Sequence, residues 1–468
     1  MGELKKRRTR RQQQKKQRRM LGIVLALLVV LVAVLCMELP ALLPDSTETA
    51  KIEEPKDTKE DKKKAARKEA ELLAQMYAYD DAIAVLQKVE GYENDADIQA
   101  EIADIEAVKA SCVPVKLEEV THIFYHSLVV DEERAFANQD RNPQAAGNNQ
   151  WMTTVDEFNA ITQEMYERGY VLVSIHDLYE VTTDASGAEK WVPAEILLPP
   201  DKKAFVLSLD DLSYYHAYDN YGYAARLILD ENGKVVNEYY DAEGKEHIGA
   251  YDCVPLLDAF VEKHPDASYR GAKGIIALTG YNGILGYRSD ETYDLSSPDC
   301  DIHQKAWIEK HPDFDLETER AEAKKVAEAM KANGWEFASH TWGHMRVGER
   351  SLSSIQVDTQ KWKKNIEPLV GPVDTIIFAH GTDLQAGGAY APSNEKYQYL
   401  REQGFRIFCN VDSHEYTTFL GEDYMRQGRR NLDGYRIYYN AIGQQNNLSD
   451  LFDAKKILDP DRPPVKEL

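Results

Sequence analysis

The chain has 468 residues, of which 43% are apolar and 29% charged, and its formal net charge is −23. This length corresponds to about three domains of ordinary size, or to one large barrel with additions. The 10% aromatic content, with 27 Tyr, excludes a disordered or collagen-like chain, and five Cys are too few for a disulfide framework.

The charge is unevenly distributed along the chain. Residues 1–19 hold ten Lys and Arg and one acid, which makes this segment +9 and leaves −32 for the remainder. An acidic body of this kind disfavours nucleic acid as a partner, because phosphates require a basic surface. We therefore predict a basic cytoplasmic tail over 1–19, followed by a soluble acidic body.

An apolar segment follows the tail. No charged residue occurs between Met20 and Met37, and residues 39–43 extend the stretch. A helix of about 20 apolar residues spans a bilayer. The stretch is longer than the apolar part of a signal peptide and has no clean cleavage site, which favours an anchor over a cleaved signal. The positive-inside rule then predicts a single-pass anchor over 20–43 in the cell membrane, with the C-terminal domain extracytoplasmic.

Two further segments precede the main domain. Residues 44–63 hold almost no large apolar side chain and are predicted to be a flexible linker. Residues 64–112 have helical periodicity, and the stretch 79–83 (YDDAI) resembles the turn and second helix of a tetratricopeptide repeat. We predict a short helical stalk there, which is either a spacer or a module that binds a protein partner.

From residue 113 to 468 the pattern alternates between strands and helices. Thr154 is expected to cap a helix, and further helices are expected over 318–333 and 394–403. Apolar runs bounded by Gly and by helices predict parallel strands over 121–130, 170–178, 204–211, 274–280, 335–341, 373–381 and 405–412. This order predicts an α/β barrel or a doubly wound sheet, with functional residues at the carboxyl ends of the strands. Residues 219–250 and 281–315 are predicted to be insertions.

Two of the predicted strands end in groups that could carry chemistry. Asp210 and Asp211 follow one strand, and His340 and His344 follow a later one. If the second stretch turns into a helix, both imidazoles lie on one face. Two neutral His and one carboxylate form a hydrolytic metal site with open positions, and the second Asp is a candidate base. The same ligands would also suit non-haem iron.

These two motifs carry a resemblance to a known family. The Asp-Asp pair and the His-Thr-x-x-His stretch, in this order, resemble the first two motifs of the NodB-homology polysaccharide deacetylases, which form carbohydrate esterase family four. The stretch THIFYHSL resembles the family's opening strand, and FNAITQEMYERGYVLVSIHDL resembles the next helix and strand. The resemblance covers about residues 120–440.

The resemblance implies a distorted (β/α) barrel and a metal-dependent hydrolase that removes N-acetyl, or sometimes O-acetyl, groups from a surface sugar polymer. It implies that Asp210 is the catalytic base. It also implies that Asp211, His340 and His344 bind a divalent metal, with zinc expected.

The chain departs from the family pattern at two further motifs. Where the third motif has an Arg, this chain has Ala379 and His380, so we expect His380 and Asp383 to line the site. In the family pattern, a strand near the C-terminus carries a His that acts as general acid. The corresponding stretch here, GYRIYYN, has no His. Asn440 and His414 are the candidates for that place.

Aromatic residues near the site have two interpretations. Tyr214, Tyr215 and Trp342 could stack on sugar rings, or they could belong to the core. We therefore predict a membrane-anchored extracytoplasmic deacetylase that acts on a cell-surface polysaccharide or peptidoglycan. The alternative is a degenerate relative that keeps the metal site and serves as a glycan-binding or scaffold module.

Overall fold

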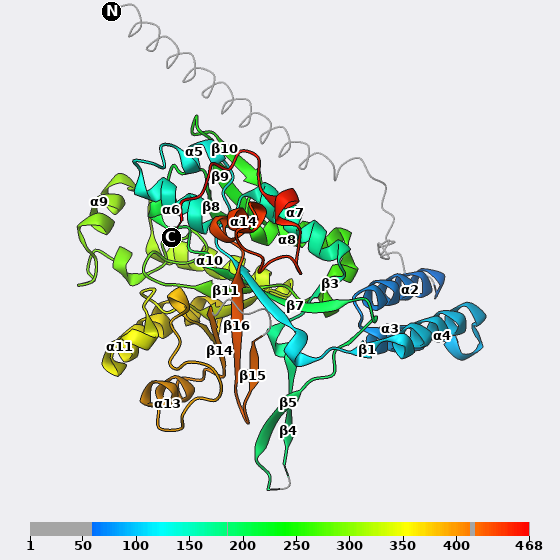
Figure 1. Cartoon of the computed structure of the whole chain (residues 1–468). Coiled ribbons are helices and arrows are strands. Elements are labelled where there is room, and N and C mark those ends of the chain that lie inside the picture. The colour runs from blue at the N-terminus through cyan, green and yellow to red at the C-terminus, as the bar shows by residue number, and fades with distance from the viewer. Residues whose placement is uncertain (1–58, 185, 412–416, 468) are drawn as a thin grey trace, which may run out of the picture. The chain divides into compact units, whose positions relative to one another are not determined.

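The computed structural model describes residues 59–184, 186–411 and 417–467 (Figure 1). The predicted tail, the predicted anchor over 20–43 and most of the predicted linker lie outside these residues, as does the predicted site residue His414. Within the described residues, no helix is both long and apolar enough to cross a membrane.

Within the described residues, seven parallel strands close into a barrel (Figure 1). Each strand pairs with the next around the ring, and β11 pairs with β7 to close it. In ring order the strands are β7 (Lys203–Asp210), β11 (Ile275–Leu278), β12 (Glu336–Ser339), β13 (Thr375–Ile377), β14 (Ile407–Val411), β16 (Met425–Asn431) and β2 (Thr121–Tyr125). The predicted distorted barrel is confirmed, with one strand fewer than a regular eight-stranded barrel.

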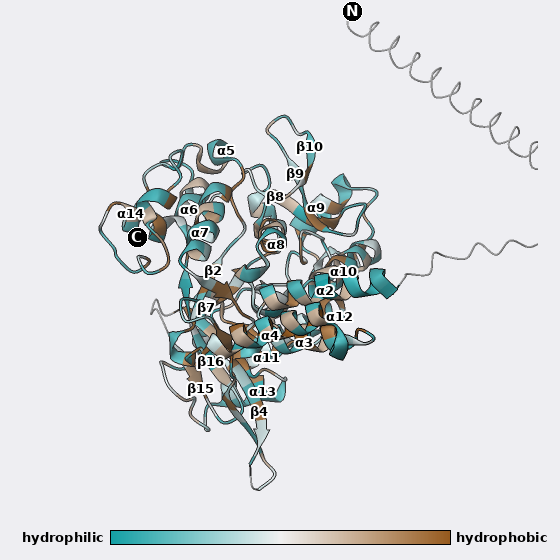
Figure 2. Cartoon of the chain, turned by 90° about the vertical axis from the view of Figure 1, so that its right-hand side faces the viewer, coloured by the Kyte–Doolittle hydropathy of each residue, from teal (hydrophilic) through white to brown (hydrophobic). Residues whose placement is uncertain are grey.

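Amphipathic helices pack on the outside of the barrel. Helix α7 begins with a capping box between Thr154 and Glu157, as its sequence predicts, and buries Phe158, Ile161 and Met165 against the strands. Helix α7 spans Val155–Glu167. The other covering helices are α8 (Cys253–Lys263), α10 (Leu316–Ala332), α11 (Leu352–Asn365), α13 (Glu395–Glu402) and α14 (Gly434–Ala441). Figure 2 shows mixed hydrophobic and hydrophilic colouring along these helices, as expected for elements with one buried face.

Strand β16 is the barrel strand that the sequence pattern does not predict. Its residues, MRQGRRN, lack the apolar run that marks the other strands, yet all but the last are buried. Successive side chains of a strand point to opposite faces. Gln427 and Arg429 accordingly reach other strands inside the barrel, whereas Arg426 and Arg430 pair with Asp383 and Asp450 in neighbouring loops.

The two segments predicted to be insertions have different structures. The first forms an antiparallel sheet of β8 (Ala224–Leu229), β9 (Val235–Tyr240) and β10 (Glu246–Gly249). The second contains α9 (Ile302–Lys310), a helix with no buried residue. Both segments follow barrel strands, β7 and β11 respectively, so they stand at the carboxyl end of the barrel where the functional residues are expected.

Three helices precede the barrel: α2 (Lys59–Gln75), α3 (Tyr79–Gln87) and α4 (Ala96–Ser111). They share a small core and also contact the barrel domain, so they are not a free stalk. The Tyr77 hydroxyl donates to the carbonyl of Asp266 at 2.7 Å, its ring stacks on Tyr269, and Asp81 pairs with Arg270. Helix α2 also begins earlier than predicted, because residues 59–63, KEDKK, are mostly Lys and Glu, which favour helix.

Smaller elements complete the fold. The hairpin of β4 (Tyr179–Thr183) and β5 (Glu189–Pro193) projects from the domain and is held by stacking of Tyr179 on Trp191 (Figure 1). The remaining strands are β1 (Val113–Pro114), β3 (Tyr170–Leu172), β6 (Leu197–Leu198) and β15 (Thr418–Leu420), and the remaining helices are α5 (Glu132–Phe136), α6 (Pro143–Trp151), α12 (Glu367–Val370) and α15 (Ala454–Ile457).

Candidate metal centre

The two acids stand where β7 ends. Asp210 is the last residue of the strand and is buried inside the barrel. Asp211 adopts a positive φ of 61°, and its amide donates to the carbonyl of Ala277 in β11. This change of backbone direction separates the two side chains, so that they can serve different partners.

The two His residues follow β12 in a tight turn, and not in the helix that would place them on one face. Thr341 and His344 have positive φ values of 65° and 50°. The carboxylate of Asp358 in α11 accepts hydrogen bonds from the amides of Trp342 and Gly343, both at 2.8 Å. These bonds hold the turn, and the turn brings both imidazoles to one side.

Asp211, His340 and His344 converge at the end of the barrel. One ligand atom from each lies within 4.8 Å of the others. The Nε2 atom of His344 is 3.5 Å from Asp211 Oδ2, and that of His340 is 4.0 Å from Asp211 Oδ1. Left-handed backbone at residues other than Gly is rare and gathers at functional sites, and it occurs here at Asp211, Tyr214, Thr341, His344 and His380.

Neighbouring groups prepare these side chains to bind a cation. His340 Nδ1 donates to the carbonyl of Ile377 at 2.7 Å, which leaves Nε2 free to face Asp211. Burial lowers the pKa of His340, so the ring is held neutral, as a metal ligand must be. The Tyr215 hydroxyl donates to Asp211 Oδ1 at 2.6 Å and fixes that carboxylate.

Arg429 holds Asp210 from the opposite wall of the barrel. Its guanidinium forms two bonds, from Nη1 to Oδ1 at 2.7 Å and from Nη2 to Oδ2 at 2.9 Å, and its side chain is fully buried. Burial alone would raise the pKa of Asp210, but Arg429, followed by His340, holds that pKa well below its usual range. Asp210 is therefore an anion at neutral pH. The family pattern places an Arg at the third motif, and this chain supplies one from β16.

A polar network inside the barrel supports Arg429. Its Nη1 also donates to Ser208, whose hydroxyl lies 2.9 Å from Nε2 of His122. The other ring nitrogen of His122 lies 2.9 Å from the Gln427 side chain. Burial and the nearby Arg429 lower the pKa of His122 to about 3, so this ring is neutral and the network carries no second positive charge. The network fixes the position of the Arg429 side chain and, through it, of the Asp210 carboxylate.

His126 is a further residue of the site whose role the sequence pattern does not predict. It follows β2, in the stretch that resembles the family's opening strand. It is among the groups that lower the pKa of Asp210, after Arg429 and His340. Burial raises the pKa of Asp433 at the start of α14, and His126 is among the groups that oppose this rise. His126 thus lies within electrostatic range of both carboxylates at the carboxyl end of the barrel.

The other predicted site residues are placed differently. The His380 ring is 4.3 Å from the His344 ring, and the Trp342 indole donates to Asp290 and has its ring edge toward Tyr281. The Asp383 carboxylate accepts hydrogen bonds from Arg426, Tyr390 and Asn410.

Two of the candidate residues have structural roles, which for Tyr214 is the core interpretation and for Asn440 corrects the predicted strand. Tyr214 lies in the hydrophobic core with its hydroxyl bound by Asn237, so its ring is not open to a sugar. Asn440 belongs to helix α14 and not to a strand, and its amide binds Arg436 and Asn447. The alternating apolar residues of GYRIYYN fit a helix face, and Asp433 caps that helix.

The chain is similar to polysaccharide deacetylases. The family model described as polysaccharide deacetylase matches residues 303–383, a segment that contains His340, His344 and His380. No curated protein matches the chain.

Two solved structures are similar at a low level. The Streptococcus pyogenes deacetylase PplD in complex with acetate has 14% identity and a TM-score of 0.34, over 69% of this chain and 94% of its own. The BpsB deacetylase domain from Bordetella bronchiseptica has 11% identity and a TM-score of 0.26, over 51% of this chain and 74% of its own. Both similarities are too low to bear on the fold, which rests on the strand pairing.

Proposed function

From the premise that this chain belongs to the polysaccharide deacetylase family, and so to the hydrolases of carbon–nitrogen bonds outside peptides, we propose that it is a metal-dependent deacetylase of a cell-surface glycan. Its substrate would be an N-acetylated, or O-acetylated, polysaccharide or peptidoglycan. The observation that carries the proposal is the convergence of Asp211, His340 and His344 beside Asp210, itself held by Arg429.

The donor set fits a divalent cation, with Zn²⁺ as the proposed ion. Two imidazole nitrogens and a carboxylate are borderline and hard donors of the kind found in catalytic zinc sites, and three protein ligands leave further positions open. Such a site requires a neutral imidazole and a carboxylate in a fixed orientation. Burial lowers the pKa of His340, and the Tyr215 hydroxyl orients Asp211. A divalent ion held by these residues would polarise an acetyl carbonyl and make a nearby water molecule more acidic.

The chain's own residues divide the remaining work. Asp210, kept anionic and in one orientation by Arg429, takes the proton of the attacking water as general base. The amide C–N bond then breaks, and the leaving amine needs a proton. His126 follows β2, the barrel strand that pairs with β7, and lies within electrostatic range of Asp210, so we assign it the role of this general acid.

Replacement of His126 tests the assignment. We expect His126→Gln to lower kcat about 10²-fold, because general acid catalysis supplies about 10²- to 10⁴-fold, and to leave metal content unchanged. Kinetics of acetate release and elemental analysis measure the two quantities. His247→Gln is the control, since His247, on β10, binds Asp241 in the turn after β9 and takes no part in the site. A His126→Gln enzyme with the kcat of the parent would refute the role.

Acetate release from N-acetylated oligosaccharides and peptidoglycan tests the function itself. We expect the purified full chain to hold about one metal ion, to release acetate, and to lose the activity on chelation and regain it with Zn²⁺. Metal binding without acetate release from any glycan would favour the alternative, a glycan-binding or scaffold module. The alternative was based on the absence of an Arg at the third motif. Arg429 weakens it, because Arg429 binds Asp210 from another strand.

The site of action is part of the proposal. The apolar segment 20–43 and the basic tail before it support a single-pass anchor in the cell membrane, with the domain outside. Helices α2–α4 would lie between anchor and barrel in the chain and could contact a protein partner. A C-terminal reporter that is active in the cytoplasm would contradict this topology.

A further inference from the structure

A short segment after β11 connects the two parts of the metal centre and contributes none of its donors. Strand β11 pairs with β7 on one side and with β12 on the other. The amide of Asp211 donates to the carbonyl of Ala277 at 3.1 Å, and the amide of His340 donates to that of Leu278 at 2.9 Å. Residues 279–281, Thr-Gly-Tyr, follow directly. They therefore continue a strand that is bonded to both ligand-bearing segments.

On one side, a chain of hydroxyl groups runs from this segment to Asp211. The Tyr215 hydroxyl donates to Asp211 Oδ1 at 2.6 Å and is also hydrogen-bonded to Thr279 Oγ1. A phenol has one proton, so with that proton directed at Asp211 the Thr279 hydroxyl must donate to Tyr215. The oxygen of Thr279 is then left to accept from the Ser213 hydroxyl, 3.2 Å away. All three hydroxyl-bearing residues are buried, which strengthens these bonds.

The chain of hydroxyl groups fixes which carboxylate oxygen of Asp211 faces the imidazoles. Oδ1 accepts from Tyr215, whereas Oδ2 lies 3.5 Å from Nε2 of His344. Rotation of the carboxylate about its Cβ–Cγ bond would break the bond to Tyr215. A carboxylate that is held in this way needs no reorientation when a cation binds. Loss of an outer partner of this kind typically weakens metal binding about 10- to 100-fold.

On the other side, the same segment holds the turn that carries the two His residues. The amide of Gly280 donates to the carbonyl of Trp342 at 2.9 Å, and that of Tyr281 donates to the same carbonyl at 3.3 Å. Trp342 lies between His340 and His344 in this turn. Position 280 requires Gly, because a Cβ there would collide with the Trp342 ring. The end of β11 therefore sets the position of the turn.

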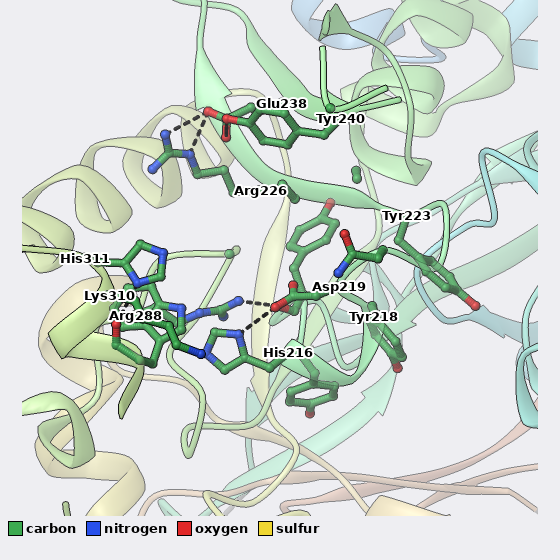
Figure 3. A pocket seen from close by; sticks show the side chains of 18 of the residues that line it. His216, Tyr218, Asp219, Tyr223, Arg226, Glu238, Tyr240, Arg288, Lys310 and His311 are labelled. Atoms are coloured by element: carbon green, nitrogen blue, oxygen red, sulfur yellow. Dashed lines mark hydrogen bonds and ion pairs between the residues drawn. The ribbon is translucent and has the colours of Figure 1, made fainter. Parts of the chain in front are cut away.

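Two further contacts join these two sides. The Tyr281 ring stacks on the Tyr215 ring, with 5.2 Å between centroids. Arg288, which lines a cleft of about 950 Å³ (Figure 3), donates to the carbonyls of Ser213 and Asn282. Its guanidinium therefore ties the residues before Tyr215 to the residues after Tyr281. The contacts between the two ligand-bearing segments thus form a closed set around the end of β11.

We propose that Ser213, Tyr215 and residues 279–281 form a bracket that sets the metal affinity of the site and the placement of its carboxylate relative to its imidazoles. The inference rests on the metal centre of the proposed function and assigns positioning residues to it outside the donor set. A merely structural role would lower the free energy of unfolding alone. The bracket lowers metal affinity as well, and by more than equally buried neighbours do.

Tyr215→Phe is the first test, because it removes only the hydroxyl that binds Asp211. We expect the dissociation constant of the full chain for Zn²⁺, measured by competition with a chromophoric chelator, to rise about 10- to 100-fold. The matched control is Tyr214→Phe, which removes the adjacent buried hydroxyl, bound by Asn237, and should leave the dissociation constant unchanged. Denaturant unfolding of both variants without metal shows whether they differ in stability.

Thr279→Val tests the direction of the hydroxyl chain. Val replaces the hydroxyl with a methyl group, so Tyr215 loses its donor but still binds Asp211. We expect the dissociation constant for Zn²⁺ to rise less than with Tyr215→Phe. The double variant should match Tyr215→Phe, because Thr279 acts on Asp211 only through Tyr215. Losses that add up in the double variant would overturn this arrangement in series.

Gly280→Ala tests the side of the bracket that holds the His turn. The added Cβ should displace Trp342 and with it the two imidazoles. We expect weaker Zn²⁺ binding and a changed visible absorption spectrum of the Co²⁺-loaded chain, which reports the arrangement of the ligands. Gly147→Ala is the control, because a Cβ at position 147 meets only Trp151, at 3.9 Å. If Gly280→Ala does not fold, the dissociation constant of Tyr215→Phe decides the proposal.

The outcomes separate this proposal from the proposed function. A parent chain that binds Zn²⁺ but releases no acetate contradicts the deacetylase assignment, and the bracket is then judged by the dissociation constants alone. A Tyr215→Phe variant with the dissociation constant of the parent would overturn the bracket, whether or not acetate is released. A parent chain that binds no Zn²⁺ would overturn the bracket together with the metal centre.

Discussion

Arg429→Lys is expected to lower kcat for acetate release about 10²-fold while the protein stays folded. The guanidinium fork of Arg429 binds both oxygens of Asp210, at 2.7 and 2.9 Å, and so fixes the plane of the carboxylate. Lys keeps the positive charge but offers a single flexible point of contact. The base then remains anionic but loses its orientation, and a positioned base is worth about 10²- to 10⁴-fold in rate.

The neighbouring Arg430 provides the control for this prediction. It lies on the same strand, is equally buried and pairs with Asp450, but points away from Asp210. We expect Arg430→Lys to change the free energy of unfolding by an amount comparable to Arg429→Lys and to leave kcat near that of the parent. Steady-state kinetics and denaturant unfolding of both variants make the comparison, and an equal loss of kcat in both would contradict the role of Arg429.

Arg429→Ala should in addition destabilise the fold. The substitution leaves the Asp210 carboxylate buried without its cation, and breaking a buried ion pair from one side costs about 3–5 kcal/mol. For this reason the Lys variant, and not the Ala variant, separates catalysis from stability.

Asp211→Ala and His344→Ala are each expected to abolish metal binding at stoichiometric concentration and to lower activity about 10³-fold or more. Each substitution removes one of three donors whose ligand atoms lie within 4.8 Å of one another. Two remaining donors do not complete a catalytic zinc site, and the loss of the ion removes several kcal/mol of transition-state stabilisation. Elemental analysis after gel filtration and acetate release measure the two effects.

His380→Gln is the matched control for the ligand variants. The His380 ring lies 4.3 Å from His344, but His380 does not belong to the converging donor set. We expect this variant to retain metal. If Asp211→Ala or His344→Ala held as much metal as the parent, the assignment of the ligands would be wrong. If His380→Gln lost the metal as well, the donor set would need a fourth member.

Much of the fold could be predicted from local sequence, because apolar runs that end in polar residues mark parallel strands wherever they occur. For the same reason, the sequence could predict Asp210 and Asp211 at the end of β7 and His340 and His344 after β12 as candidate site residues. Their convergence depends on the turn after β12, where Thr341 and His344 adopt positive φ. The spacing of the two His residues predicted convergence through a helix, but hydrogen bonds from the amides of Trp342 and Gly343 to Asp358, fourteen residues after His344, impose a turn instead.

The sequence by itself determined six of the seven barrel strands, the four candidate metal-ligand and base residues, and the resemblance that these residues carry. The tertiary structure alone decided which Arg orients the base, since Arg429 and Asp210 are 219 residues apart and meet only when the barrel closes. Strand β16 escaped prediction because its inward side chains are polar and are satisfied by Asp210, Ser208 and His122 across the barrel. A polar strand is stable only where such partners exist, and partners of this kind are a property of the closed ring and not of the local sequence.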